Sequence, residues 1–147
     1  MLLAIERVGH HEAFDLLVRA GFFADVAVPV DAAGVGAAFD GSNLVATART
    51  EDGRLVGVCR ALTDFARQCF VATLAVDPEM GGHGIGRALM ARVHEAAGGA
   101  DRIVLFVHAA PASFGFYERL GMTRDSDFFR LDATRSTGTP GGRSTGP

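Results

Sequence analysis

The stretch EMGGHGIGRALM, residues 79–90, places four glycines within six residues. A β-like run precedes it, and apolar residues at helical spacing follow it. Glycines between a strand and a helix start let backbone N–H groups converge on an anion, which the positive end of the helix dipole also favours. The stretch therefore predicts a strand, a phosphate-binding loop and a helix in succession, with a tight turn that holds no ligand as the alternative.

Two familiar nucleotide-binding motifs match this stretch only in part. A dinucleotide fingerprint needs a glycine where the chain has Arg87, and it needs an early βαβ unit that the sequence does not predict. A P-loop needs lysine and then serine or threonine where the chain has Arg87 and Ala88. A P-loop-like binder of Mg-ATP is therefore the least favoured hypothesis.

Composition limits the remaining function classes. The chain has 147 residues, 48% of them hydrophobic, which suits one domain with a real core. Its net charge of −3 offers no broad attraction to nucleic acid or to anionic membrane surfaces. The sequence shows neither a leader pattern at its start nor an apolar run of about 18 residues, so we expect a cytoplasmic protein without a membrane partner.

Before the glycine loop, the pattern predicts two helices and then three strands. Apolar spacing predicts a helix over residues 10–22, and Asp31 is a plausible N-cap for a second helix that runs through Phe39. Residues 44–49, 54–62 and 70–76 are typical of strands, and Glu51-Asp52-Gly53 contains a hairpin signal. The three strands should form an antiparallel meander.

After the loop, helices and strands alternate. We expect a helix over residues 85–97, and the run RIVLFVH, residues 102–108, predicts a central strand covered on both faces. Pro111 starts a short helix that ends near Leu120, and residues 127–131 predict a last strand. Residues 133–147 are rich in Gly, Ser, Thr and Pro, so we expect a domain over 1–132 and a disordered or cloning-derived tail over 133–147.

Three blocks of the sequence resemble the GNAT N-acetyltransferase superfamily in order and spacing. They are LAVDP (74–78), GGHGIGRAL (81–89) and FYERLGM (116–122), and the resemblance extends over about residues 44–131. The run LTDF at residues 62–65 is similar to small bacterial members. The resemblance implies an α/β fold with a mixed, mostly antiparallel central sheet flanked by helices, and a homodimer as a reasonable assembly.

The resemblance also implies a reaction and a set of site residues. In such proteins a strand pairs through its backbone with the pantetheine arm of acetyl-CoA, which points here to Leu74, Ala75 and Val76. The loop amides take the pyrophosphate, which points to Gly82, His83, Gly84, Ile85, Gly86 and Arg87. Tyr117, the chain's only tyrosine, occupies the position of the general acid that protonates the CoA thiolate. The implied function is direct transfer of acetyl from acetyl-CoA to a primary amine of a small molecule or peptide.

The chain departs from the family pattern at three places. Gly81 stands where arginine or glutamine is common, and Ala110 stands where asparagine is common. Residues 70–76 contain no carboxylate that could act as base. The base is therefore unassigned, and the candidates are Thr73, Asp64, His83 and His108. These departures motivate an alternative hypothesis, a non-catalytic GNAT-like module that binds CoA or a partner protein.

Other residue clusters carry weaker predictions. His10 and His11 lack further ligands at zinc spacing, so no metal site is expected. Cys59 and Cys69 lie nearly symmetrically about a predicted turn, which suggests reduced cross-strand neighbours. Three arginines and four phenylalanines each have two possible roles. Arg87, Arg92 and Arg102 contact the 3′-phosphate of CoA or form a solvated face, and Phe22, Phe23, Phe65 and Phe70 belong to the core or line an acceptor pocket.

Overall fold

The computed structural model of the chain describes residues 1–24, 31–125 and 127–133. The chain divides into two compact units, Met1–Ala109 and Ala110–Pro147. The expected tail beyond Ala133 lies outside the described residues. Among the helices that are described, none has the length and apolar character needed to cross a bilayer.

The described part of the first unit holds a five-stranded sheet in the order β1-β2-β3-β4-β5. The strands are β1 (Leu2–Ile5), β2 (Leu44–Arg49), β3 (Leu55–Thr63), β4 (Gln68–Val76) and β5 (Val104–Val107). Neighbours among β1 to β4 pair antiparallel, and β5 pairs parallel with β4. This confirms the expected mixed, mostly antiparallel sheet and the meander formed by β2 to β4.

Three helices flank this sheet, and their ends follow local sequence signals. They are α1 (His10–Arg19), α2 (Ala32–Asp40) and α3 (Ile85–Ala97). The bounds of α3 are those predicted, and Asp31 stands at the N-cap of α2 as expected. Helix α1 ends earlier than predicted, because Gly21 adopts a φ of 73° that a continuing helix cannot accommodate.

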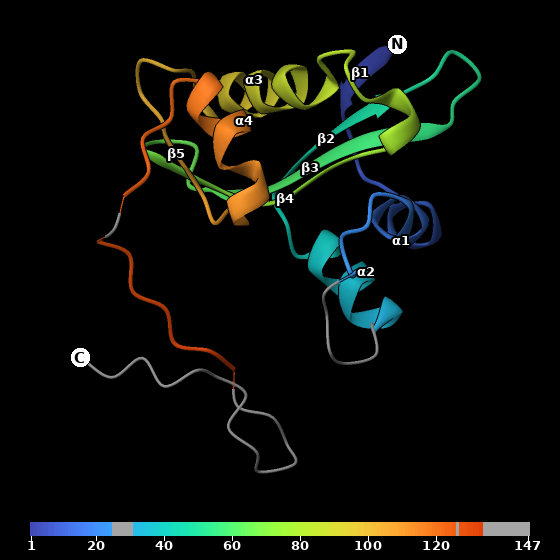
Figure 1. Cartoon of the computed structure of the whole chain (residues 1–147), viewed down its shortest axis with the longest axis horizontal. Coiled ribbons are helices and arrows are strands. Elements are labelled where there is room, and N and C mark those ends of the chain that lie inside the picture. The colour runs from blue at the N-terminus through green and yellow to red at the C-terminus, as the bar shows by residue number, and fades with distance from the viewer. Residues whose placement is uncertain (25–30, 126, 134–147) are drawn as a thin grey trace. The chain divides into compact units, whose positions relative to one another are not determined.

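The helices cover opposite faces of the sheet (Figure 1), with α1 and α2 on one face and α3 on the other. On the first face, buried residues of both helices form one cluster with strand residues such as Val45, Val58 and Ala75. On the second face α3 approaches closely at Gly57, where an added Cβ would lie 2.9 Å from Ile85 Cγ2 and 3.0 Å from Leu89 Cδ1. Close packing at Gly57 therefore seats the beginning of α3 directly on β3.

Both outer strands of the sheet differ from the sequence-based expectation. Strand β1 was not predicted, because its mostly exposed residues lack the alternation that marks a half-buried strand. Strand β5 was expected to be central and covered on both faces, and this is wrong for the described sheet, where it lies at the edge and Val104 is 55% exposed. A continuous apolar run indicates a strand without showing how many neighbours it has.

The second unit begins with η2 (Pro111–Ser113) and α4 (Phe114–Arg119), which matches the predicted short helix. Helix α4 ends in a Schellman motif, in which Met122 N–H bonds the Tyr117 carbonyl and Gly121 N–H bonds the Glu118 carbonyl. Gly121 has the required left-handed φ of 88°. The glycine of the FYERLGM block therefore terminates this helix.

The predicted strand over residues 127–131 is wrong. These residues form no strand or helix, and Phe129 and Leu131 are 96% and 97% exposed. A strand is stabilised by hydrogen bonds to a neighbour, and no described strand pairs with this segment. Its apolar residues alone could not show that a partner was missing.

The two cysteines are not direct cross-strand partners, which corrects the expectation from their symmetry about the turn. Cys59 lies opposite Leu74, and Cys69 lies opposite Thr63. The hairpin is off-centre relative to that symmetry, and a register shift follows Arg60. Both thiols are free and buried, and burial raises the pKa of Cys59 to about 12. Neither thiol has the low pKa that makes a cysteine reactive.

Candidate functional site

The candidate site in the first unit begins where β4 loses its neighbour β5. The two strands pair from Gln68 with Val104 to Val71 with Val107, whereas β4 continues to Val76. On its other side β4 stays paired with β3 as far as Val76. The second edge of β4 beyond Val71 therefore has no partner strand among the described residues.

The backbone direction along this edge follows from one hydrogen bond. Asp77 N–H donates to the carbonyl of Val56 at 2.8 Å, so Asp77 faces β3. Backbone groups of successive strand residues point to opposite sides, so Ala75 also faces β3, and Leu74 and Val76 face the open edge. The open edge therefore presents the N–H and C=O groups of Leu74 and Val76.

The glycine loop continues directly from this strand through η1 (Pro78–Met80) to the first turn of α3. Gly82 and Gly84 have φ angles of 80° and 74°, in the left-handed region that favours glycine. An added Cβ at either position would meet no atom within 4 Å, so the backbone angle rather than the space accounts for these glycines.

The N-terminus of α3 carries no side-chain cap and no acidic residue in its first turn. Its N-cap is Gly84, which has no side chain to accept from the N–H groups of Ile85, Gly86 and Arg87. These donors, together with the helix dipole, suit an anion that approaches from outside. The loop residues of the prediction thus lie in the turn before α3 and in the first turn of α3, and η1 connects them to the end of β4.

His83 folds back onto its own loop. Its Nδ1 lies 3.1 Å from the Met80 carbonyl and 3.0 Å from the Gly81 carbonyl, and the residue is exposed. With a proton on Nδ1, the ring donates to these carbonyls and closes the turn. The described contacts of His83 therefore support a role in holding the conformation of the loop, since both are with backbone carbonyls of the loop itself.

Asp77 anchors the junction between β4 and the loop, and sequence reasoning had given it no role. Its side chain is 2% exposed and accepts from Glu79 N–H at 3.0 Å, Arg19 Nε at 3.1 Å and Arg54 Nη2 at 3.3 Å. The bond from Glu79 N–H and the nearby Arg19 lower the pKa of Asp77, against the effect of its burial. The Asp-Pro pair at positions 77–78 is the local signal that could have revealed this N-cap.

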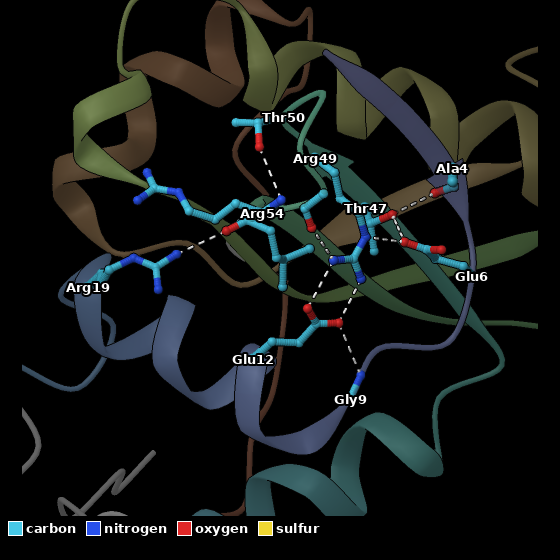
Figure 2. A network of polar contacts seen from close by, with 11 residues as sticks. Ala4, Glu6, Gly9, Glu12, Arg19, Thr47, Arg49, Thr50 and Arg54 are labelled. Atoms are coloured by element: carbon cyan, nitrogen blue, oxygen red, sulfur yellow. Dashed lines mark hydrogen bonds and ion pairs between the residues drawn. The ribbon is translucent and has the colours of Figure 1, made fainter.

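Arginines also tie α1 to the sheet beside this junction (Figure 2). Arg49 on β2 donates to Glu6 at 2.7 Å and to both carboxylate oxygens of Glu12 at 2.9 and 2.6 Å. Arg19 donates from Nη2 to the Leu55 carbonyl at 2.9 Å. Helix α1 is therefore fixed to β2 and β3, and its hydrogen bonds to Arg49 lower the pKa of Glu12.

The structure characterises the candidate bases without assigning one. Backbone N–H groups of Arg67, Gln68 and Ala66 bind Asp64 and lower its pKa to about 2, far from the range that suits a base at neutral pH. Thr73 is buried, and its hydroxyl accepts from Arg60 Nε at 3.1 Å. His108 follows β5 and is exposed.

Tyr117 lies in the second unit, on the half-buried side of α4. Its ring packs edge-on against Phe116, with ring centroids 4.9 Å apart and an interplanar angle of 79°. The carbonyl of Tyr117 is the acceptor of the Schellman bond from Met122. Its backbone position is therefore fixed by the same motif that ends the helix.

Several remaining candidates stay as predicted. Arg87 and Arg102 are exposed and Arg92 is half-buried, which suits either a phosphate contact or a solvated face. Within the described ranges, no three His, Cys, Asp or Glu side chains come together in a way that could hold a metal ion.

Comparisons with known proteins agree with this architecture. The family model for the acetyltransferase (GNAT) domain matches residues 41–123, which include β2 to β5, the glycine loop and α4. A mycothiol acetyltransferase of Rhodococcus opacus is 36% identical over 112 residues, or 74% of this chain. The chain spans only 36% of the length of that relative.

Solved structures share the fold over nearly the whole chain. A putative acetyltransferase from Deinococcus radiodurans superposes with a TM-score of 0.69 at 25% identity, covering 88% of this chain and 87% of that one. A GNAT family protein from Streptococcus pneumoniae gives a TM-score of 0.70 at 20% identity and covers 92% and 98% of the two chains. The second likeness concerns the fold alone.

Proposed function

Because the chain belongs to the GNAT acetyltransferase family, we propose that it transfers acetyl from acetyl-CoA to a primary amine of a small molecule or peptide. The observation that carries the proposal is the open edge of β4, which leads directly into the glycine loop. An extended pantetheine arm can add to that edge as a further strand does. The pyrophosphate then reaches the N–H groups at the start of α3.

The fit of acetyl-CoA rests on the donors that this chain presents. Leu74 and Val76 provide the open-edge backbone groups, and Ala75 holds the strand to β3 from the other side. The N–H groups of Ile85 and Gly86 lie in the first turn of α3, which carries no side-chain cap, and a helix supplies no internal acceptor to the N–H groups of its first turn. Asp77 lies between the two sets of donors in the chain, and its side chain accepts from the backbone N–H of Glu79 and from Arg19 of α1.

In the proposed reaction, the amine nitrogen attacks the carbonyl carbon of the thioester, and the carbon–sulfur bond breaks. The leaving thiolate takes the proton of the Tyr117 hydroxyl, and the proton of the new ammonium group passes to water or a base. A proton from solvent then restores the Tyr117 hydroxyl. Backbone donors on β4 hold the carbonyl oxygen as negative charge develops there. The products are an N-acetyl amine and CoA.

A non-catalytic CoA-binding module is the second candidate, and one observation favours it. Residues 70–76 carry no carboxylate, Asp64 is committed to its turn, and Thr73 is bonded to Arg60. None of the described contacts in this region identifies a base for the incoming ammonium. Such a module would bind acetyl-CoA and leave it intact.

A turnover assay with an amine panel separates the two candidates. The panel comprises polyamines, aminoglycosides, amino acids and peptides with a free N-terminus or lysine. The readouts are the free thiol of CoA and a mass gain of about 42 Da on the amine, which corresponds to the added C2H2O. We expect steady CoA release with at least one amine. Binding of acetyl-CoA without release in any mixture would favour the non-catalytic module.

The open edge of β4 gives a backbone-level prediction. Val76→Pro removes one N–H that faces this edge, and we expect acetyl-CoA to bind at least about tenfold more weakly. The β3 ladder keeps its bonds because Val76 faces away from it, so the unfolding midpoint should change little. Val76→Ala keeps the N–H and is the matched control. Equal affinity of the proline and alanine variants, measured by calorimetry, would contradict pairing at Val76.

The assembly is part of the same proposal. We propose a homodimer, as the resemblance to the family suggests, and light scattering coupled to size-exclusion chromatography measures it. A mass near twice 15.4 kDa is the expected result. A mass of one chain at the concentrations of the assay would remove the dimer from the account without affecting the reaction.

A further inference from the structure

Arg60, on β3, is a half-buried cation whose partners are all uncharged. Its Nε donates to Thr73 Oγ1 at 3.1 Å, and its Nη1 donates to Ser42 Oγ at 3.1 Å and to the Ala38 carbonyl at 3.5 Å. Its guanidinium carbon lies 5.6 Å from the centre of the Phe39 ring. These contacts hold the guanidinium group between β4 and the end of α2.

The arginine lacks a counter-ion among the described residues. Arg19, Arg49 and Arg54 each pair with at least one carboxylate within 4.0 Å, and Arg60 pairs with none in this part of the chain. Its Nη2 has no described hydrogen-bond partner either. Burial alone lowers the pKa of Arg60, with no opposing effect from a nearby negative charge. A desolvated cation of this kind gains from an anion supplied by a ligand.

Arg60 also lies beside the strand residues that lead to the open edge. Its partner Thr73 directly precedes Leu74, whose backbone faces that edge, and consecutive Cα atoms are about 3.8 Å apart. The contacts with Ser42 and Phe39 place Arg60 on the face of the sheet where α2 lies. Helix α1 covers the same face (Figure 1). The glycine loop leads into α3 on the opposite face, so the pyrophosphate of CoA does not account for Arg60.

We propose that Arg60 binds an anionic group of the acceptor, so that the preferred acceptor is an amine that also carries a carboxylate or a phosphate. This inference rests on the proposed acetyl transfer, since it assigns the acceptor end of that site. Nη2 of a guanidinium held at Nε and Nη1 offers donors in a fixed direction, which suits a planar carboxylate or a phosphate oxygen. The amine of the same molecule then lies toward Leu74 and the thioester.

A competing role for Arg60 is purely structural. The same hydrogen bonds to Ser42 and Ala38 fix the C-terminal end of α2, where a cation is favourable. In that role a loss of Arg60 lowers stability and leaves the choice between charged and neutral acceptors unchanged. A change in the preference for anionic over neutral acceptors therefore distinguishes the two roles, whereas a loss of stability on substitution of Arg60 does not.

The test measures binding and turnover separately with matched pairs of amines. Each pair differs in one anionic group: glycine with glycinamide, a dipeptide with its C-terminal amide, and phosphoethanolamine with ethanolamine. The first two pairs report on a carboxylate and the third on a phosphate. Affinities come from calorimetry on the full chain, with and without CoA, and acetyl transfer comes from CoA release.

We expect the wild-type protein to bind the anionic member of at least one pair about tenfold or more tightly than its neutral partner. Arg60→Gln should abolish that preference, and Arg60→Lys should retain part of it. Arg67→Gln is the matched control, because Arg67 is an exposed arginine on the same hairpin. Ser42→Ala loosens the anchor of Arg60 without removing its charge, and should keep the preference even where it lowers the unfolding midpoint.

The outcomes separate this inference from the proposed function. A charge preference that depends on Arg60, in a protein that releases no CoA, supports the anion site and overturns acetyl transfer. Acetyl transfer with the same selectivity in wild type and Arg60→Gln overturns the anion site and leaves the proposed function intact. Failure of every anionic member to outcompete its neutral partner also overturns the anion site.

Discussion

Tyr117→Phe is expected to lower the turnover number for acetyl transfer by at least about tenfold, with the affinity for acetyl-CoA nearly unchanged. The substitution removes one hydroxyl and keeps the ring that packs against Phe116 at 4.9 Å. General acid catalysis by a positioned group typically contributes about 10²–10⁴-fold, and water can replace part of it. Steady-state kinetics with the best amine of the panel measures the turnover number, and calorimetry measures the affinity.

A matched change in the same helix controls for packing. Phe116→Leu disturbs the ring contact with Tyr117 while it keeps the hydroxyl, so turnover should fall less than in Tyr117→Phe. Unchanged turnover in Tyr117→Phe would remove the hydroxyl from the mechanism. A parallel loss of acetyl-CoA affinity would assign Tyr117 a binding role in place of the acid role.

Asp77→Ala is expected to have the largest effect on stability, lowering the free energy of unfolding by about 2–4 kcal/mol. The change leaves Glu79 N–H without its acceptor and leaves Arg19 and Arg54 without their shared buried carboxylate. Urea denaturation at neutral pH measures the difference. Asp77→Asn keeps an acceptor for Glu79 N–H and loses only the charge, so its effect should be smaller.

The contribution of Asp77 should also depend on pH with a defined sign. The folded-state pKa of Asp77 lies below its ordinary value of 3.8, so its stabilisation is present at neutral pH and is lost as the pH falls below about 4. The gap between wild type and Asp77→Asn should therefore narrow in that range. Asp101→Asn, at an exposed position, should show no such gap. A gap that stays constant down to pH 3 would contradict the role of the charge.

The place of the glycine loop between β4 and α3, and the bounds of α3, could be predicted because their determinants are local. The short helix η1 within that stretch was not predicted. Gly84 and Gly98 bracket the helix at positive φ angles, and Ile85, Leu89 and Val93 form its buried stripe. Each of these signals lies within one helix length of the sequence. The bounds of β2 followed from local patterns in the same way.

The features that sequence reasoning missed depend on residues that are far apart in the chain. Arg19 and Asp77 are 58 positions apart, and no local pattern indicates that α1 meets the end of β4. The pairing of β1 with β2 and the edge position of β5 are properties of the sheet as a whole. In the sequence, nothing distinguishes Arg60 from a solvated arginine on a strand. Its contacts with α2 and Thr73 appear only when the sheet is assembled.

Acetyl-CoA binding shows whether the open edge of β4 and the glycine loop together form a cofactor site. The experiment is a calorimetric titration of the full chain with acetyl-CoA, with Mg-ATP and NAD as controls. We expect a micromolar dissociation constant for acetyl-CoA, which corresponds to a binding free energy of about −8 kcal/mol. Mg-ATP and NAD should give no heat of binding. Val76→Pro should weaken that binding, and Val76→Ala should not. A folded protein that does not bind acetyl-CoA would contradict the assignment of this site and the proposed acetyl transfer.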